Sequence, residues 1–268
     1  MRRRGDGSTR GSTRSAGVLA RRLGLGLAAA IVLGGCDFGI PDPVTEQGAQ
    51  THTLWRIYVF SALAVGVLVW GLILWAAIRY RRRSDRVPGQ RQYFTKLEVT
   101  YTIIPLVIVG VLFAFSLRTQ GRVVDLDPDP DVVVEVLGFQ WQWQFHYPDA
   151  GVTIAGTPDN PPELVVPAER TVRLHLVAND VIHSFWVPEF LEKRDLIPGI
   201  DNQIDIDVEE PGVWDGRCAE YCGLDHWRMS FTARALPPDE FEEWLADQEG
   251  REQPQLAGAD ETSNGEDG

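Results

Sequence analysis

Four side chains within a twelve-residue stretch are of types that bind soft metal ions: Cys218, Cys222, His226 and Met229. Thiolate and thioether sulfur favour copper and iron–sulfur clusters, imidazole suits copper and zinc, and a weak methionine ligand is typical of copper electron-transfer sites. A zinc site would not need the methionine, and a mononuclear blue-copper site would need only one thiolate. The motif therefore predicts a copper site with two shared thiolates, and a Cys218–Cys222 disulfide is the structural alternative.

A further strong ligand must come from elsewhere in the chain, and His183 is the candidate. It lies in the segment Asp180-Val181-Ile182-His183-Ser184-Phe185-Trp186, 35 residues before Cys218. In a β-sandwich, loops from different strands can meet at one pole and bring such distant residues together. The other three histidines lack companion donors, and we expect no ligand role for them: His52, His146 and His175.

Charge is divided unevenly along the chain. Residues 121–268 contain 32 acidic and 9 basic side chains, whereas residues 79–96 contain six Arg and one Lys against one Asp. This asymmetry predicts a membrane protein with an acidic outer domain and a basic cytoplasmic loop. It argues against nucleic acid as a partner and favours a basic protein, because opposite charges raise the encounter rate. Acidity that serves only solubility is the alternative.

The first 35 residues have the pattern of a secretory signal peptide. Seven arginines precede or flank the 11-residue apolar core LGLGLAAAIVL, which is too short to span a bilayer. Leu33-Gly34-Gly35-Cys36 resembles the lipobox of bacterial lipoproteins, which implies cleavage before Cys36 and acylation of its thiol. The alternative is a cysteine within an ordinary or uncleaved signal.

Two apolar segments predict a transmembrane hairpin. Residues 57–78 contain no charged side chain and are long enough to cross a hydrocarbon core of about 30 Å. Residues 99–117 form a second predicted span, with Pro105 inside it. Residues 79–98 would be the cytoplasmic loop. Residues 36–56 and the residues after the second span would then lie on the extracytoplasmic side. The hairpin therefore puts both mature ends and the acidic domain on the extracytoplasmic side.

Beyond the second span, the pattern changes from helical to strand-like. Residues 132–136, 171–176 and 204–208 are rich in β-branched residues, and the last two segments alternate strictly. Short strands between Pro and Asp turns predict an antiparallel β-sandwich or Greek-key barrel over residues 118–248. Residues 237–248 resemble an amphipathic helix that turns Phe241, Trp244 and Leu245 inward. The acidic, Gly-rich residues 249–268 predict a disordered tail.

Taken together, these motifs resemble subunit II of the bacterial haem–copper cytochrome c oxidases. The resemblance implies a cupredoxin-like domain with a dinuclear copper A centre. In it, Cys218 and Cys222 would bridge two copper ions. His183 and Met229 would complete one ion, and His226 with the backbone carbonyl of Glu220 the other. It further implies that the Glu220 carboxylate helps to bind magnesium at the interface with subunit I. A solvated loop acid is the alternative for that side chain.

The resemblance also assigns roles to two residues outside the copper motif. In Gly138-Phe139-Gln140-Trp141-Gln142-Trp143, the first tryptophan would be the ring through which electrons enter from cytochrome c, although core packing is the usual role of such rings. Glu98 would lie near the mouth of a proton pathway, or it is simply an acid favoured at a helix N-terminus. Tyr101 departs from the family, which more often has tryptophan there.

The function that the resemblance implies is electron transfer within a larger complex. The chain would accept electrons from cytochrome c or a cytochrome c-type domain and pass them to haem in subunit I, where oxygen is reduced to water and protons are pumped; subunit III is a further implied partner. Two related families are rival assignments. Quinol oxidase subunit II lacks the copper ligands that this chain has, and nitrous oxide reductase lacks the membrane hairpin, so both are disfavoured. A copper-carrying or purely structural lipoprotein is the alternative from another class.

Overall fold

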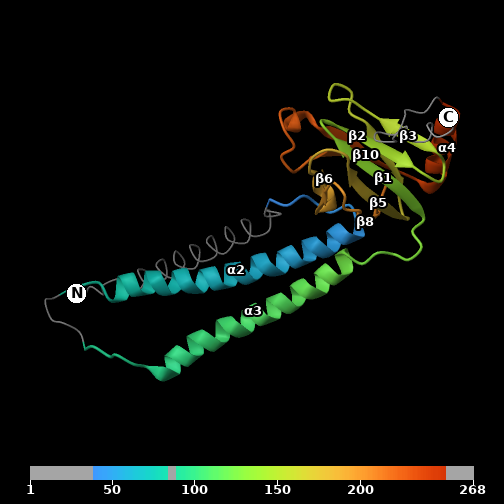
Figure 1. The fold of residues 1–268 in the computed structure, drawn as a ribbon. Helices are drawn as coiled ribbons and strands as arrows, with labels where there is room; N and C mark the ends of the chain where they lie inside the picture. Colours follow the sequence, from blue (N-terminus) through green and yellow to red (C-terminus); the bar gives the residue numbers. More distant parts are fainter. Residues whose placement is uncertain (1–38, 84–88, 252–268) are drawn as a thin grey trace, which may run out of the picture. The chain divides into compact units, whose positions relative to one another are not determined.

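The structure is a computed structural model that describes residues 39–83 and 89–251. The predicted signal peptide and Cys36 lie outside the described residues, as do residues 252–268 of the predicted tail. Two long helices precede a β-rich domain, which a short helix completes (Figure 1).

The helical hairpin consists of α2 (Glu46–Arg79) and α3 (Thr95–Val123). Both helices are long and apolar enough to cross a membrane. Helix α2 begins well before the apolar stretch at residue 57, because the Thr45 hydroxyl caps it by accepting a hydrogen bond from the Gly48 N–H at 3.0 Å. The Tyr58 hydroxyl lies 2.7 Å from Ser116 Oγ, so a polar contact joins the two helices.

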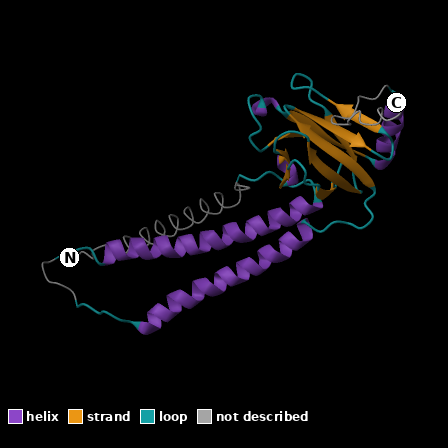
Figure 2. Cartoon of the chain, in the orientation of Figure 1, coloured by secondary structure: helices purple, strands orange, loops and turns teal. Residues whose placement is uncertain are grey.

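Ten strands form two five-stranded sheets (Figure 2). In spatial order, the first sheet contains β3 (Val152–Ala155), β2 (Gln142–Tyr147), β1 (Val132–Phe139), β5 (Thr171–Ala178) and β8 (Asn202–Asp207). The second contains β4 (Glu163–Pro167), β10 (Ser230–Leu236), β9 (Gly212–Cys218), β6 (His183–Val187) and β7 (Glu192–Leu196). The 3-10 helices η1 (Pro188–Phe190) and η2 (His226–Arg228) and helix α4 (Pro238–Glu249) complete the domain. The predicted two-helix hairpin followed by a β-sandwich is confirmed.

The expectation of purely antiparallel sheets was wrong at two pairings. Strand β1 pairs in parallel with β5, and β10 pairs in parallel with β4. In each case the two strands are joined through other elements rather than by a tight turn, which parallel pairing requires. The sandwich is therefore built from two mixed sheets.

The core lies between the sheets and follows from the alternation of their strands. On β5, every second residue from Val172 to Ala178 is buried, and the residues between them are partly exposed. The ring of Trp143 packs edge-on against Phe185 and Phe231, which stack on each other with centroids 4.9 Å apart. Burial of such rings removes a large apolar area from water and is the main stabilising term. This aromatic layer lies directly beneath the predicted metal ligands.

The two sheets are also joined by a buried hydrogen bond at an edge. The hydroxyl of Tyr147 donates to the Val165 carbonyl at 2.8 Å and accepts from the Val165 N–H at 3.0 Å. Burial raises the pKa of this phenol well above its usual range. Helix α4 covers this region with Phe241 buried and Trp244 packed on Tyr147, as its amphipathic pattern predicts.

Candidate metal centre

The strand pairing brings the predicted ligands to one pole of the sandwich. His183 is the first residue of β6 and Cys218 the last residue of β9, and these neighbouring antiparallel strands pair Phe185 with Cys218. The chain then forms a loop over residues 219–229. Its end returns to Cys218, whose N–H donates to the Met229 carbonyl at 2.9 Å. Residues 35 positions apart thus meet because of nonlocal strand pairing.

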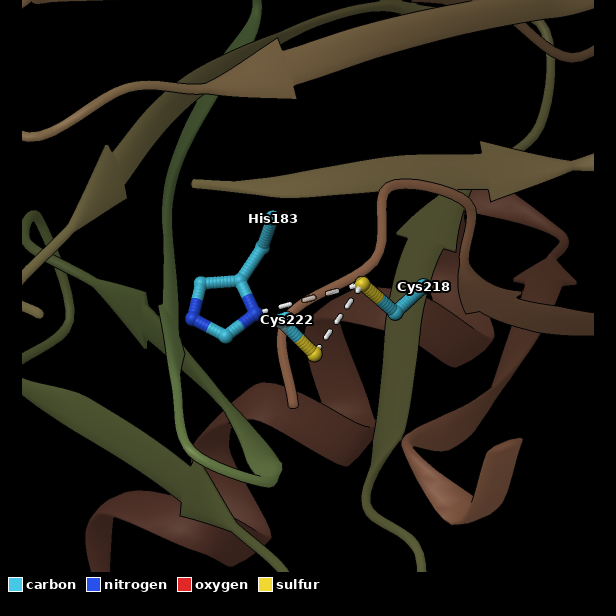
Figure 3. A group of neighbouring side chains, drawn as sticks. All are labelled: His183, Cys218 and Cys222. Atoms are coloured by element: carbon cyan, nitrogen blue, oxygen red, sulfur yellow. Dashed lines mark hydrogen bonds between the residues drawn. The ribbon is translucent and has the colours of Figure 1, made fainter. Parts of the chain in front are cut away.

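The three central side chains face one another in the protein interior (Figure 3). His183, Cys218 and Cys222 are buried, and their potential ligand atoms all lie within 4.8 Å of one another. The Sγ atom of Cys218 lies 3.9 Å from His183 Nδ1 and 3.8 Å from the Sγ of Cys222. The sulfur separation excludes a disulfide here, because an S–S bond is about 2.05 Å long. Both thiols remain free to bind a metal.

The other three predicted donors extend the cluster on either side. The Cys222 Sγ lies 3.5 Å from His226 Nδ1 and 3.7 Å from Met229 Sδ. The Cys218 Sγ lies 3.2 Å from the Glu220 carbonyl oxygen. Met229 is buried and His226 is partly exposed. The four other donors therefore lie around the two cysteine sulfur atoms.

The two thiols have different acidities because their surroundings differ. Burial raises the pKa of Cys218, but the interaction with His183 and hydrogen bonds with neighbouring groups more than offset this effect and bring the pKa to about 7. Burial and the adjacent Cys218 together raise the pKa of Cys222 to about 12. Cys218 thus loses its proton first, and the negative charge that it then carries keeps Cys222 protonated. A bound cation would remove this restraint, since thiols that ligate a metal are deprotonated.

The turn between β1 and β2 supports the ligand loop. The Gln140 amide Nε2 donates to the Cys222 carbonyl at 2.7 Å, and the Trp141 indole Nε1 donates to the same oxygen at 3.3 Å. Gly223 has a φ of +125°, and a Cβ there would lie 3.0 Å from Gln140 Nε2. Only glycine therefore lets the loop pass this close to Gln140 and Trp141.

Asp180 holds His183 from the side opposite the thiols. Its Oδ1 atom lies 2.9 Å from His183 Nε2, and its Oδ2 atom accepts from the Gln140 N–H at 2.7 Å. Burial alone would raise the pKa of Asp180, but hydrogen bonds from Gln140, His183 and Val181 more than offset that effect and lower it. Sequence reasoning assigned Asp180 no role at this site. The signal that it missed was the spacing of three residues between an acid and a predicted ligand.

The donor set fits copper better than zinc or a hard cation. It combines two thiolates, two imidazoles, a thioether and one carbonyl, and most of these donors are soft. A hard cation such as magnesium would require mainly oxygen ligands. The residues present therefore suit copper.

Comparisons with known proteins agree with this chemistry. A family model described as "Cytochrome C oxidase subunit II, transmembrane domain" matches residues 36–119, and one described as "Cytochrome C oxidase subunit II, periplasmic domain" matches residues 157–236. The "Probable cytochrome c oxidase subunit 2" of Streptomyces avermitilis is 39% identical over an alignment that covers 85% of this chain and 87% of that protein. The chain belongs to the cytochrome c oxidase subunit II family.

Other subunit II proteins are similar over comparable lengths. The protein of Mycobacterium tuberculosis is 31% identical over 85% of this chain and 80% of its own. The crystal structure of the periplasmic domain of subunit II from Bradyrhizobium japonicum matches 46% of this chain and 96% of that domain, with 32% identity and a TM-score of 0.42. Membership confirms the predicted family, the cupredoxin-like fold class and the role as an oxidoreductase component of a haem–copper oxidase. It also indicates a membrane protein with an extracytoplasmic domain.

The remaining predicted residues of this subunit II chain occupy varied positions. Trp141 is partly buried beside the ligand loop, whereas Trp143, which shares its motif, is fully buried in the core. The Glu220 side chain is exposed next to the cluster. Glu98 lies in the first turn of α3, where its Oε1 accepts from the Phe94 N–H at 3.0 Å. That contact is the one expected of a helix N-terminal acid. The predicted site of lipidation, Cys36, lies outside the described residues.

Proposed function

We propose that this chain carries the dinuclear copper A centre of a cytochrome c oxidase. It accepts electrons one at a time from reduced cytochrome c and passes them to haem in subunit I, where oxygen is reduced to water and protons are pumped. The observation that carries the proposal is the convergence of four further donors on two buried sulfur atoms that are 3.8 Å apart.

The protein residues divide the work of holding the metal ions. Cys218 and Cys222 would contribute thiolates to both ions, His183 and Met229 would be further ligands of one ion, and His226 with the Glu220 carbonyl would be further ligands of the other. A copper pair held by these residues would supply a centre that takes up and releases one electron at a time, which suits electron transfer. The burial of His183 and Met229 supports the proposal, because it excludes water from the centre.

Trp141 is the proposed entry point for electrons. Its ring is partly exposed, and its indole N–H is hydrogen-bonded to the carbonyl of Cys222. A donor that touches this ring is therefore connected to a ligand residue by one hydrogen bond. The buried ring of Trp143 offers no comparable access from the surface.

The surroundings of the centre suit partner proteins. Exposed apolar side chains gather on the loops near the ligands: Val181, Ile182, Tyr221, Leu224 and Trp227. Exposed apolar patches on folded domains mark interaction sites. The strongly acidic domain favours a basic cytochrome c as donor. Subunit I would cover part of this pole, where the Glu220 carboxylate could share a magnesium ion with it.

The membrane hairpin completes the proposal. The basic loop between α2 and α3 is cytoplasmic, and both mature ends and the β domain are extracytoplasmic. Acylation of Cys36 adds a lipid anchor, and Glu98 serves the entrance of a proton pathway in subunit I. The alternative role of Glu98, as a helix N-terminal acid, agrees with its hydrogen bond to Phe94.

Rapid mixing of the assembled oxidase with reduced cytochrome c tests this order of events. The absorption of the copper centre should bleach before the haem of subunit I becomes reduced, because electrons reach the haem through this chain. An oxidase with the substitution Trp186→Gln, on the outer face of the second sheet, serves as the control. Its copper centre should also bleach before the haem becomes reduced. Reduction of the haem without prior bleaching of the copper centre would contradict the proposal.

A further inference from the structure

We propose that Asp180 is a positioning residue that fixes the ring orientation and the proton position of His183. The same carboxylate ties this ligand to the β1–β2 turn, so the site is arranged before metal binds. The inference rests on the proposed function, because it treats His183 as a copper ligand.

The hydrogen bonds of one carboxylate carry the first step. Oδ1 of Asp180 lies 2.9 Å from His183 Nε2 and 2.6 Å from the Val181 N–H, and Oδ2 accepts from the Gln140 N–H at 2.7 Å. An ionised carboxylate can only accept hydrogen bonds, so the ring nitrogen that faces it must carry the proton. The lone pair of a neutral His183 ring is then on Nδ1.

The position of that lone pair is the second step. Nδ1 is the ring atom that faces the Cys218 sulfur at 3.9 Å, whereas Nε2 is on the far side of the ring (Figure 3). A histidine can bind a metal only through a nitrogen that carries no proton. Hydrogen bonding of the other nitrogen to a carboxylate fixes the tautomer and makes the ligand more basic. Asp180 therefore prepares His183 to bind metal on the side of the thiols.

The β1–β2 turn links this ligand to the second cysteine. Gln140 donates its backbone N–H to Asp180 and its side-chain amide to the Cys222 carbonyl at 2.7 Å. At Gly138 in the same region, a Cβ would lie 3.3 Å from the Cβ of His183, so the strand passes directly against the ligand. One turn from the first sheet thus contacts both ligand segments of the second sheet, and Asp180 makes one of the two connections.

A docking role alone would make different demands on Asp180. The side chain is 31% exposed, so it also contributes negative charge to the surface. Docking needs only that charge, and its loss would change the binding of a basic cytochrome. A positioning role needs two acceptor oxygens in place. Asparagine offers one acceptor oxygen and an amide group that only donates, so it cannot satisfy both His183 and Gln140.

The test is the variant Asp180→Asn in the full-length chain loaded with copper. We expect its copper affinity, measured by competition with a chelator, to fall about 10- to 100-fold, as is typical when the partner of a metal ligand is lost. The reduction potential should rise, because a less basic His183 stabilises the oxidised centre less. The hyperfine-shifted proton on the His183 ring should exchange faster with water in NMR spectra.

Two further variants keep the outcome decisive. Asp225→Asn removes an equal charge near the centre without touching the His183 ring, so it reveals any shift of the reduction potential that comes from charge alone. It should leave the copper affinity and the exchange of the His183 ring proton unchanged. Asp180→Glu keeps both acceptor oxygens and serves as a second variant if Asp180→Asn folds poorly. Its copper affinity should lie between that of Asp180→Asn and that of the unaltered chain. Values for Asp180→Asn equal to those of Asp225→Asn would overturn the inference. If the unaltered chain itself binds no copper pair, the proposed function fails instead.

Discussion

Replacing Cys222 by serine is expected to remove the copper pair and stop electron transfer to oxygen. Cys222 Sγ lies 3.5 Å from His226 and 3.7 Å from Met229, so its loss removes a donor from both sides of the centre. A serine hydroxyl stays protonated and is a hard ligand, unlike a soft thiolate. Oxidase turnover with cytochrome c should fall by more than the roughly 10- to 100-fold that losing an outer partner of a ligand costs.

Cys36→Ser provides a matched control for this experiment. It is the same chemical change at the third cysteine of the chain, in a segment remote in sequence from the ligand motif. Copper per purified chain, measured by elemental analysis, should remain two in the control and fall below one in Cys222→Ser. Retention of two copper ions in Cys222→Ser is incompatible with a bridging role for this cysteine.

Replacing Trp141 by glutamine should slow the entry of electrons while the copper content stays unchanged. A glutamine amide can still donate a hydrogen bond, so the Cys222 carbonyl need not lose its partner. The aromatic contact surface is lost, and a tryptophan at the centre of an interface typically contributes about 2 kcal/mol or more, which is roughly thirtyfold in rate or affinity. Stopped-flow reduction of the copper centre by cytochrome c measures the effect.

Trp186→Gln is the control for ring removal. Trp186 is a partly exposed tryptophan of β6 that packs against Arg217 on the outer face of the second sheet. Its replacement should leave the rate of electron entry unchanged. A normal rate in Trp141→Gln, or equal slowing in both variants, means that electrons enter elsewhere.

Much of the site could be predicted because its donors are of unusual types at close spacing. Cys218, Cys222, His226 and Met229 are neighbours in the sequence, and the other three histidines, unlike His183, offered no companion donors. Their mutual distances could not be predicted. These distances depend on two strand pairings, β6 with β9 and β9 with β10. Each pairing joins residues that are not neighbours in the sequence.

The residues that support the ligands could not be identified from the sequence, because their contacts are also nonlocal. Asp180 and Gln140 are 40 residues apart, and nothing local indicates that a backbone N–H of one reaches the carboxylate of the other. The parallel pairing of β1 with β5 is equally nonlocal, since alternation within a strand does not reveal its neighbour. The early start of α2 reflects the Thr45 cap, whereas apolar composition marks only its membrane-spanning part.

The metal content of the purified full-length chain tests the central claim most directly. After copper loading, elemental analysis combined with electron paramagnetic resonance should find two copper ions per chain that share one unpaired electron, as expected if the thiolates of Cys218 and Cys222 are ligands of both ions. A single copper ion with an ordinary one-metal spectrum, or a preference for zinc, would contradict the account.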